Sequence, residues 1–315
     1  MSTINLAQGH AVATRGGERR GMSPRVRRNL ITGLLFILPW VIGFLWFYAY
    51  PLGASIYYSL MRYDLINPVR FVGLENYRRM FADELVWKSL YNTAYISWCI
   101  VPLSSVIGLA LALLLNQRMR YRALFRTIFY LPTLVPVVAL SIMWTFVLDP
   151  NFGLLNSVLA SLGLPGVGWL TNPQTAKPTL VMMGLWGVGG PTVLYLAALQ
   201  DVPRSLYEAA TIDGANRWQS IWHITIPMVT PTILFVVITG LIGSFQYFTQ
   251  AYLMTSGGPA YATLTYTLYL FWNAFRWFKM GYASAMAWIL FFIVAALTLL
   301  LFRSSARWVY YGGSD

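Results

Sequence analysis

The chain has 315 residues, of which 57% are hydrophobic and only 10% are charged, and its formal net charge is +12. Soluble domains carry about a quarter charged residues, so this composition excludes an ordinary soluble protein and indicates an integral membrane protein. The excess of basic residues calls for no nucleic acid, because anchoring to an anionic membrane surface accounts for it.

The N-terminal residues 1–28 are polar and rich in arginine. The apolar run that follows them is not followed by a small-residue cleavage site, which favours a retained tail over a cleaved signal peptide. Basic residues cluster before the first apolar stretch and between the second and third: Arg25, Arg27, Arg28, Arg118, Arg120, Arg122 and Arg126. The positive-inside rule therefore predicts a multi-pass protein with both tails, 1–28 and 304–315, in the cytoplasm.

Residues 29–303 are predicted to form a transmembrane domain of six helices, each near the ~20 residues that a crossing needs. The expected spans run approximately from Leu30 to Tyr50, Asn92 to Leu115, Thr127 to Leu148, Thr179 to Leu199, Met228 to Ala251 and Tyr282 to Phe302. Residues 150–176 contain many Gly, Pro and Asn residues, which predicts an irregular external loop. About fifteen residues separate Pro259 from Arg276, too few for a crossing, so an interfacial segment is expected there.

None of the six expected spans contains Asp, Glu, Lys, Arg or His. Ion-coupled carriers place such groups inside the membrane, where a central charge costs about 3 kcal/mol, so a self-powered carrier is disfavoured. Neutral polar groups suit a neutral polyhydroxy cargo, because rings stack on a sugar's apolar faces while amides and hydroxyls bond its edges. The candidates in spans four and five are Trp186, Thr192, Tyr195, Thr239, Ser244, Gln246, Tyr247, Thr249 and Gln250.

Two other roles for these side chains remain open. Aromatic residues also form interfacial belts, and amides or hydroxyls also bond to neighbouring helices. Prolines within spans three to five predict kinks: Pro132, Pro136, Pro191 and Pro231. Gly187, Gly189 and Gly190 loosen the fourth span, where cavity lining and close helix packing are both possible. The single cysteine, Cys99, lies in the second span and is expected to be a packing group.

Residues 201–227, between the fourth and fifth spans, form the most informative part of the chain. Ser205 and Glu208 have capping-box spacing, and Ala209 and Ala210 would continue a short helix. Gly214 permits a reversal, after which residues 218–226 would form an amphipathic piece that ends at Pro227. The sequence therefore predicts a bent knob on the membrane surface.

The order Glu-Ala-Ala, three residues, Gly214, nine residues and a closing Ile-x-Ile-Pro resembles the cytoplasmic coupling loop of bacterial ABC importer permeases. In that family the loop sits in a cleft of a separate ATPase. The resemblance implies that the loop's functional residues are Glu208, Ala209, Ala210, Asp213, Gly214, Ile224 and Pro227. A lone Glu208 could equally be a helix cap.

Residues 71–77, 255–259 and 281–285 are similar to carbohydrate-importer permeases related to the larger maltose permease subunit. Matching the Glu-Ala-Ala and Gly-Gly-Pro landmarks places five residues near that family's sugar contacts: Trp186, Thr192, Gly243, Ser244 and Tyr247. The register in the fourth span requires a one-residue gap. Gln246 joins this candidate substrate path because a buried amide needs a partner.

The resemblance implies an all-α permease of the ABC type I importer fold, located in the bacterial inner membrane, that forms half of a path for a neutral sugar, oligosaccharide or related polyol. Its partners would be a second homologous permease, two copies of an ABC ATPase and an extracytoplasmic substrate-binding protein. The chain has no Gly-x-x-x-x-Gly-Lys-Ser/Thr loop. It is therefore not expected to be an enzyme or to hold a cofactor or metal, and ATP-Mg would bind the partner ATPase.

Three other functions compete with this one. A glycerol-phosphate permease would share the loop motifs but would need a cationic group facing its cargo, which the partner subunit could supply. An intramembrane enzyme is disfavoured because His10 and His223, the two histidines, lie outside the spans. A self-contained secondary carrier would lack coupling charges and would have no use for the Glu208 loop.

Overall fold

The structure, a computed structural model, describes residues 24–117 and 120–310 of the chain. Most of the predicted N-terminal tail, residues 1–23, therefore lies outside the described residues, and residues 24–28 belong to the first helix. The α-helices are α1 (Pro24–Phe44), α2 (Tyr50–Ser59), α3 (Glu75–Phe81), α4 (Glu84–Leu115), α5 (Arg122–Tyr130), α6 (Val137–Val147), α7 (Leu154–Ser161), α8 (Pro173–Leu185), α9 (Gly189–Asp201), α10 (Arg204–Ile212), α11 (Arg217–Ser220), α12 (Ile226–Phe245), α13 (Tyr266–Phe271) and α14 (Met280–Ser305).

Short π turns and one 3-10 turn join or interrupt these helices. They are η1 (Leu45–Ala49), η2 (Leu131–Leu134), η3 (Ile221–Thr225), η4 (Ala251–Thr255) and η5 (Trp272–Arg276), of which η2 is the 3-10 turn. The strands β1 (Met61–Arg62) and β2 (Arg70–Phe71) pair antiparallel and form a small hairpin. The fold is otherwise helical, as predicted.

The chain divides into two compact units, residues 1–54 and 55–315. The described part of the first unit is helical and apolar. It forms most of the candidate span Arg27–Ser59, and no residue in the most apolar stretch of that span is buried. The rings of Trp40, Phe44 and Tyr48 stack one turn apart along it. This helix confirms the first predicted span and extends it at both ends.

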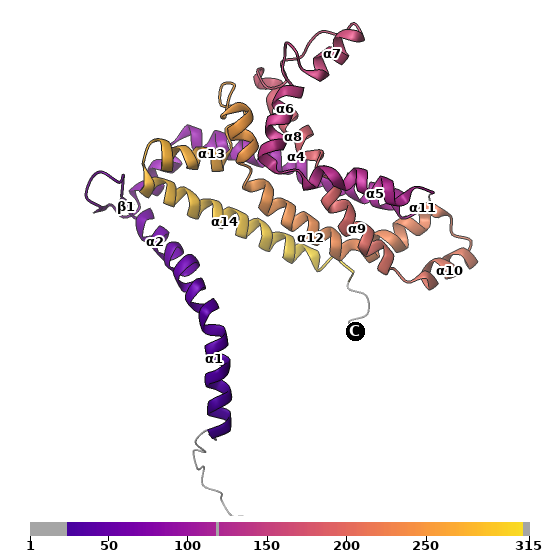
Figure 1. The fold of residues 1–315 in the computed structure, drawn as a ribbon, viewed down its shortest axis with the longest axis horizontal. Helices are drawn as coiled ribbons and strands as arrows, with labels where there is room; N and C mark the ends of the chain where they lie inside the picture. The colour runs from indigo at the N-terminus through magenta and orange to yellow at the C-terminus, as the bar shows by residue number, and fades with distance from the viewer. Residues whose placement is uncertain (1–23, 118–119, 311–315) are drawn as a thin grey trace, which may run out of the picture. The chain divides into compact units, whose positions relative to one another are not determined.

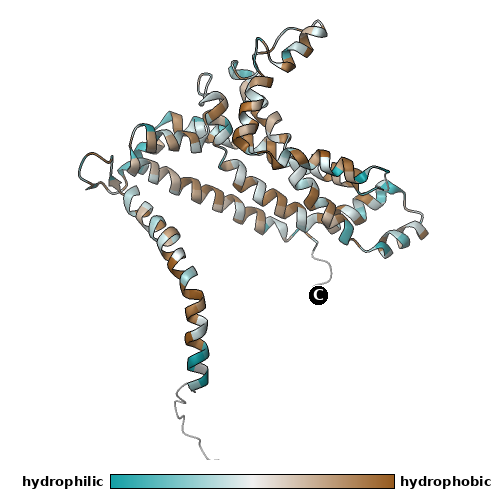
Figure 2. Cartoon of the chain, in the orientation of Figure 1, coloured by the Kyte–Doolittle hydropathy of each residue, from teal (hydrophilic) through white to brown (hydrophobic). Residues whose placement is uncertain are grey.

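The second unit is built around the long helices α4, α12 and α14. Helix α4 contacts α8, α9, α12 and α13, and α12 also contacts α14, beside which it runs in Figure 1. Figure 2 shows apolar residues along α12 and α14, and polar residues around α10. Because a lipid-exposed helix satisfies all its backbone groups internally, this arrangement suits a bilayer.

Among the described residues, four helices are long and apolar enough to span a membrane, and six spans result if each of two bent pairs forms one. The third predicted span bends by 98° between η2 and α6, and the fourth by 42° between α8 and α9. Pro132 and Pro136 bracket the first bend, as expected from their missing backbone donors. Pro231, by contrast, lies inside a continuous α12.

The loop 150–176 is more regular than predicted. Helix α7 occupies its middle, because the helix-breaking Gly and Pro residues lie outside residues 154–161. Asn156 ties the loop together: its Nδ2 donates to the carbonyls of Pro150 and Val167, both at 3.0 Å. Its Oδ1 accepts from the Val167 amide at 3.1 Å and from Trp169 Nε1 at 2.9 Å.

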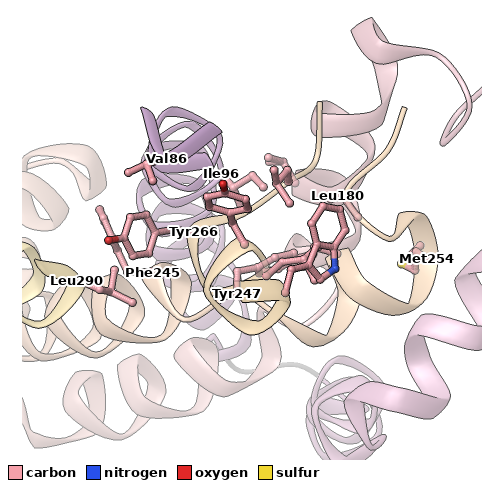
Figure 3. Close-up of a cluster of buried hydrophobic side chains, with 14 of the residues drawn as sticks. Val86, Ile96, Leu180, Phe245, Tyr247, Met254, Tyr266 and Leu290 are labelled. Atoms are coloured by element: carbon pink, nitrogen blue, oxygen red, sulfur yellow. The ribbon is translucent and has the colours of Figure 1, made fainter. Parts of the chain in front are cut away.

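The segment after Pro259 forms only the short helix α13 and the π turn η5, which confirms that it is too short to span. It is packed into the protein. The Tyr266 amide donates to Thr93 Oγ1 of α4 at 2.8 Å, and the Tyr266 hydroxyl donates to the Met286 carbonyl of α14 at 3.0 Å. Figure 3 shows Tyr266, Phe245 and Tyr247 among the buried side chains of the core.

Gly189 lies where α9 packs against the end of α5. A Cβ there would overlap the Phe129 carbonyl oxygen and lie 2.9 Å from Tyr130 Cα, both backbone atoms that yield little. We expect Gly189→Ala to destabilise the protein by about 1–3 kcal/mol through overpacking, seen as a lower thermal unfolding midpoint in detergent.

The matched control is Gly190→Ala, because a Cβ at the neighbouring position has no atom within 4 Å. That change should leave the midpoint unchanged or raise it, since alanine favours a helix by about 0.5–1 kcal/mol over glycine. Equal midpoints for the two variants would show that the contact between α9 and α5 is not tight.

Candidate functional site

The 201–227 segment forms a helix, a glycine turn and a second helix. Helix α10 ends in a Schellman motif: the Ala215 amide donates to the Ala210 carbonyl at 2.9 Å, and the Gly214 amide donates to the Thr211 carbonyl at 3.2 Å. Gly214 has φ +77°, a conformation that glycine adopts without the steric cost of a Cβ. The predicted reversal at Gly214 is therefore present.

The caps differ from those predicted. The N-cap of α10 is Pro203, without a side-chain cap, so Ser205 and Glu208 form no capping box. The real capping box lies across the turn, where Gln219 N donates to Asn216 Oδ1 at 2.9 Å and Asn216 N donates to Gln219 Oε1 at 2.7 Å. The signal Asn-x-x-Gln was present in the sequence.

The second helix was predicted to end at Pro227, and this prediction is wrong. The helix continues through Pro227 as one helical run from Arg217 to Phe245. The π turn η3 directly precedes α12, and Pro227 is the second residue of α12. A π turn widens the helix, so the ring of a following proline is accommodated. The 201–227 segment is thus directly continuous with the fifth span.

Two contacts connect α10 to the bundle. The hydroxyls of Tyr207 and Thr225 lie 2.9 Å apart and share a hydrogen bond. Tyr207 and Ile224 also pack on a buried cluster that contains Leu115 of α4 and Leu199 of α9. A displacement of α10 therefore acts on three spans at once.

The turn itself presents an exposed apolar surface. Ile212 is 87% exposed and Trp218 is 72% exposed, and Trp222 is exposed nearby. A concavity of about 340 Å³ in the same segment is lined by Ala210, Asp213, Gly214 and Ile224 among others. Glu208 and Ala209 lie exposed on α10. Large apolar side chains gathered on a protruding turn are typical of a docking surface.

The six candidate path residues separate into two groups. Trp186, Gly243 and Gln246 are exposed, and a Cβ at Gly243 would meet open space. The Trp186 ring meets that of Trp144 edge to face, with centroids 5.6 Å apart. Trp186 follows the last residue of α8, at the bend before α9. These three residues have surface free for a ligand.

Thr192, Ser244 and Tyr247 are buried. The Thr192 hydroxyl donates to the Val188 carbonyl at 2.8 Å and the Ser244 hydroxyl donates to the Leu241 carbonyl at 3.0 Å. Both hydroxyls are thus engaged by their own chain. The Tyr247 hydroxyl is shielded from solvent and has no hydrogen-bond partner among the described residues.

Gln246 and Tyr247 lie beyond the end of α12 rather than inside a span, because the helix stops at Phe245. The Tyr247 carbonyl accepts hydrogen bonds from Thr265 Oγ1 at 2.8 Å and Thr267 Oγ1 at 3.2 Å. Non-helical backbone at membrane depth is tolerated where such partners satisfy it. This break is a second irregular point among the candidate path residues, which sequence reasoning missed.

The helices that form the candidate spans are longer than predicted. Their outer turns therefore include charged residues that lie outside the predicted spans. Lys177 lies in the second turn of α8. Its Nζ donates to Asn92 Oδ1 at 3.2 Å and lies 4.8 Å and 5.2 Å from the ring centroids of Tyr91 and Tyr95. The Lys177 ammonium therefore already has an amide acceptor and two aromatic rings around it.

These features define a polytopic α-helical membrane protein that carries an exposed helix–turn–helix continuous with one of its spans. Residues 104–309 match the family of binding-protein-dependent transport system inner membrane components, and the chain belongs to this family. It is 40% identical over 305 residues to the probable ABC transporter permease protein YesP of Bacillus subtilis, covering 95% of this chain and 98% of YesP.

It is also 37% identical to the lactose transport system permease protein LacF of Rhizobium radiobacter, over 87% of this chain and 94% of LacF. Among solved structures, a bacterial alginate ABC transporter in complex with an alginate pentasaccharide-bound periplasmic protein has a chain with a TM-score of 0.80. That match covers 90% of this chain and 96% of that one at 24% identity, which supports the fold.

Proposed function

We propose that the chain is one of two permease subunits of an ABC importer for a neutral sugar, oligosaccharide or related polyol. Two ATPase subunits bind ATP-Mg and close on the 201–227 segments, and an extracytoplasmic binding protein delivers the cargo. Both termini and the 201–227 segment face the cytoplasm. The permease relatives and the match to a family of binding-protein-dependent transport components support this assignment.

The observation that carries the proposal is the rigid connection between the 201–227 segment and the spans. The run from Arg217 to Phe245 is one helix, and the Tyr207–Thr225 hydrogen bond holds α10 against it. A partner that moves Ile212 and Trp218 therefore moves α12 and the break at Gln246 at its far end. Alternating access needs such a connection between motor and cavity.

The candidate path residues support a neutral cargo, since Trp186, Gly243 and Gln246 offer a ring, an open backbone and an amide, and no charge. The relative LacF is named for lactose, a neutral disaccharide. The alternative, a glycerol-phosphate cargo, needs a cation on the path, and Lys177 is already engaged by Asn92. Measuring which radiolabelled sugars a deletion strain fails to accumulate, with glycerol phosphate as competitor, separates the two.

Cross-linking tests the motor connection. Cys99 is the only cysteine, so Ile212→Cys in a Cys99→Ala background places a single thiol on the exposed turn. We expect a bifunctional maleimide to join it, in intact membranes, to one protein that is also labelled by an azido-ATP probe. A thiol made by Leu164→Cys, at a position that is 52% exposed in the loop between α7 and α8, should give no such adduct. Failure of the 212 thiol to capture a nucleotide-binding protein would refute the proposal.

A further inference from the structure

A cavity of about 830 Å³ lies where α4 ends, α5 begins and α9 passes into α10. Three arginines from two of these elements line it: Arg122 and Arg126 of α5 and Arg204 of α10. Asn116 and Gln200 add side-chain amides to its wall. The cavity is therefore rich in hydrogen-bond donors.

The cavity carries an unbalanced positive charge. Glu208 supplies the one carboxylate among the lining residues. In the described residues the salt bridges join Arg62 and Arg79 to Glu75, and the three cavity arginines form none. An anion bound here would gain charge-assisted hydrogen bonds from forked guanidinium groups, which match phosphate oxygens well.

The hydrogen bonding of the Arg122 guanidinium is incomplete. Its Nε is shielded from solvent and has no hydrogen-bond partner among the described residues, while its Nη2 donates to Asn116 Oδ1 at a long 3.4 Å. An unpaired buried donor costs about 1–3 kcal/mol or more when charged. An acceptor oxygen from a ligand would remove this cost.

The position of the cavity indicates where the ligand comes from. Asn116 follows the last residue of the apolar span α4, and Gln200 lies in the last turn of α9, so the cavity is at the level where spans meet lipid headgroups. Helix α5 is amphipathic: Leu124 and Ile128 are exposed on the face opposite Arg122 and Arg126. Such a helix offers apolar contact to acyl chains beside a basic contact to headgroups.

We propose that this cavity binds the phosphodiester of an anionic phospholipid headgroup, held by Arg122, Arg126 and Arg204. Tyr207, Glu208 and Thr211 of α10 line the same cavity. The bound headgroup therefore contacts the 201–227 segment and links the charge of the membrane to the position of that segment. Binding itself does not require the proposed transport function, because it is a property of the chain alone.

The test uses the full-length chain purified in a neutral detergent and native mass spectrometry of lipid adducts. The probes are dioctanoyl-phosphatidylglycerol, dioctanoyl-phosphatidylcholine of equal chain length, and inorganic phosphate. We expect retention of phosphatidylglycerol over phosphatidylcholine. Each basic residue near an anionic surface contributes about fivefold, so Arg122→Gln combined with Arg126→Gln should weaken phosphatidylglycerol binding about twenty-five-fold.

The matched control removes Arg303 and Arg307, two exposed arginines at the end of α14, by substitution with glutamine, and should leave the affinity unchanged. The wild-type preference between the two lipids needs no variant and tests the proposal even if the α5 variant fails to fold. Equal retention of the two lipids, or unchanged binding by the α5 variant, would overturn it. Inorganic phosphate binding as tightly as phosphatidylglycerol would assign the cavity to a soluble phosphate compound and also overturn it.

Discussion

Gly214→Pro is expected to reduce uptake to the level of cells that lack the chain, while the protein still inserts into the membrane. Proline fixes φ near −65°, whereas this position has φ +77°. It also has no amide hydrogen, so the hydrogen bond from Gly214 N to the Thr211 carbonyl is lost. The turn would open and displace Ile212 and Ala215, and radiolabelled uptake beside a membrane immunoblot measures both effects.

Gly214→Ala should show an intermediate effect. A non-glycine residue in the left-handed region costs about 1–2 kcal/mol, which corresponds to about a five- to thirty-fold loss if the turn conformation limits transport. The matched control is Gly163→Ala, because Gly163 has φ +70° and open space around it but lies in the loop between α7 and α8. Normal uptake by Gly214→Pro would refute the role of the 201–227 segment in coupling.

The 201–227 segment could be located from sequence because its features are local. Gly214 is a turn glycine whatever packs beside it, and the positions of six apolar stretches follow from hydropathy alone. Its caps were less predictable. Two competing capping boxes, Ser205 with Glu208 and Asn216 with Gln219, have the same spacing, and only the second is formed. The π turn before Pro227 has no comparable local signature in the sequence.

The candidate path shows where sequence reasoning reaches its limit. Thr192, Ser244 and Gln246 all resemble polar groups available to a cargo, yet the first two are buried and bonded to their own helices. Whether a side chain faces a cavity or a neighbouring helix depends on helix rotation, and all-apolar spans carry almost no amphipathic signal for it. The break at Gln246 was missed for a related reason, since neither glycine nor proline marks it.

Loss of Asp83 should strongly destabilise the fold, because its carboxylate joins three helices, although it was not singled out in the sequence. Its Oδ1 accepts from the Leu85 amide at 3.0 Å and caps α4. Its Oδ2 accepts from the hydroxyls of Tyr269 of α13 at 2.7 Å and Tyr282 of α14 at 2.9 Å. Burial and the neighbouring carboxylate raise the pKa of Tyr269, so this phenol remains a donor at neutral and moderately alkaline pH.

Asp83→Ala removes the cap and leaves two phenols without their acceptor. Each of the two hydrogen bonds to the carboxylate contributes about 1.5–3 kcal/mol and the cap about 1 kcal/mol, so we expect a loss of roughly 4–7 kcal/mol. The measurement is the unfolding midpoint in detergent, together with the amount of chain recovered from membranes. Asp83→Asn keeps the cap acceptor and the shape, and should cost about half as much.

Asp149→Ala serves as the control, because Asp149 Oδ1 also accepts backbone amides, those of Asn151 and Phe152, but binds no other helix. Its loss should cost no more than about 1 kcal/mol. The difference between the two alanine variants therefore isolates the phenol contacts that join α4 to α13 and α14. Equal losses would show that Asp83 acts only as a helix cap, and that packing rather than this carboxylate holds the three helices together.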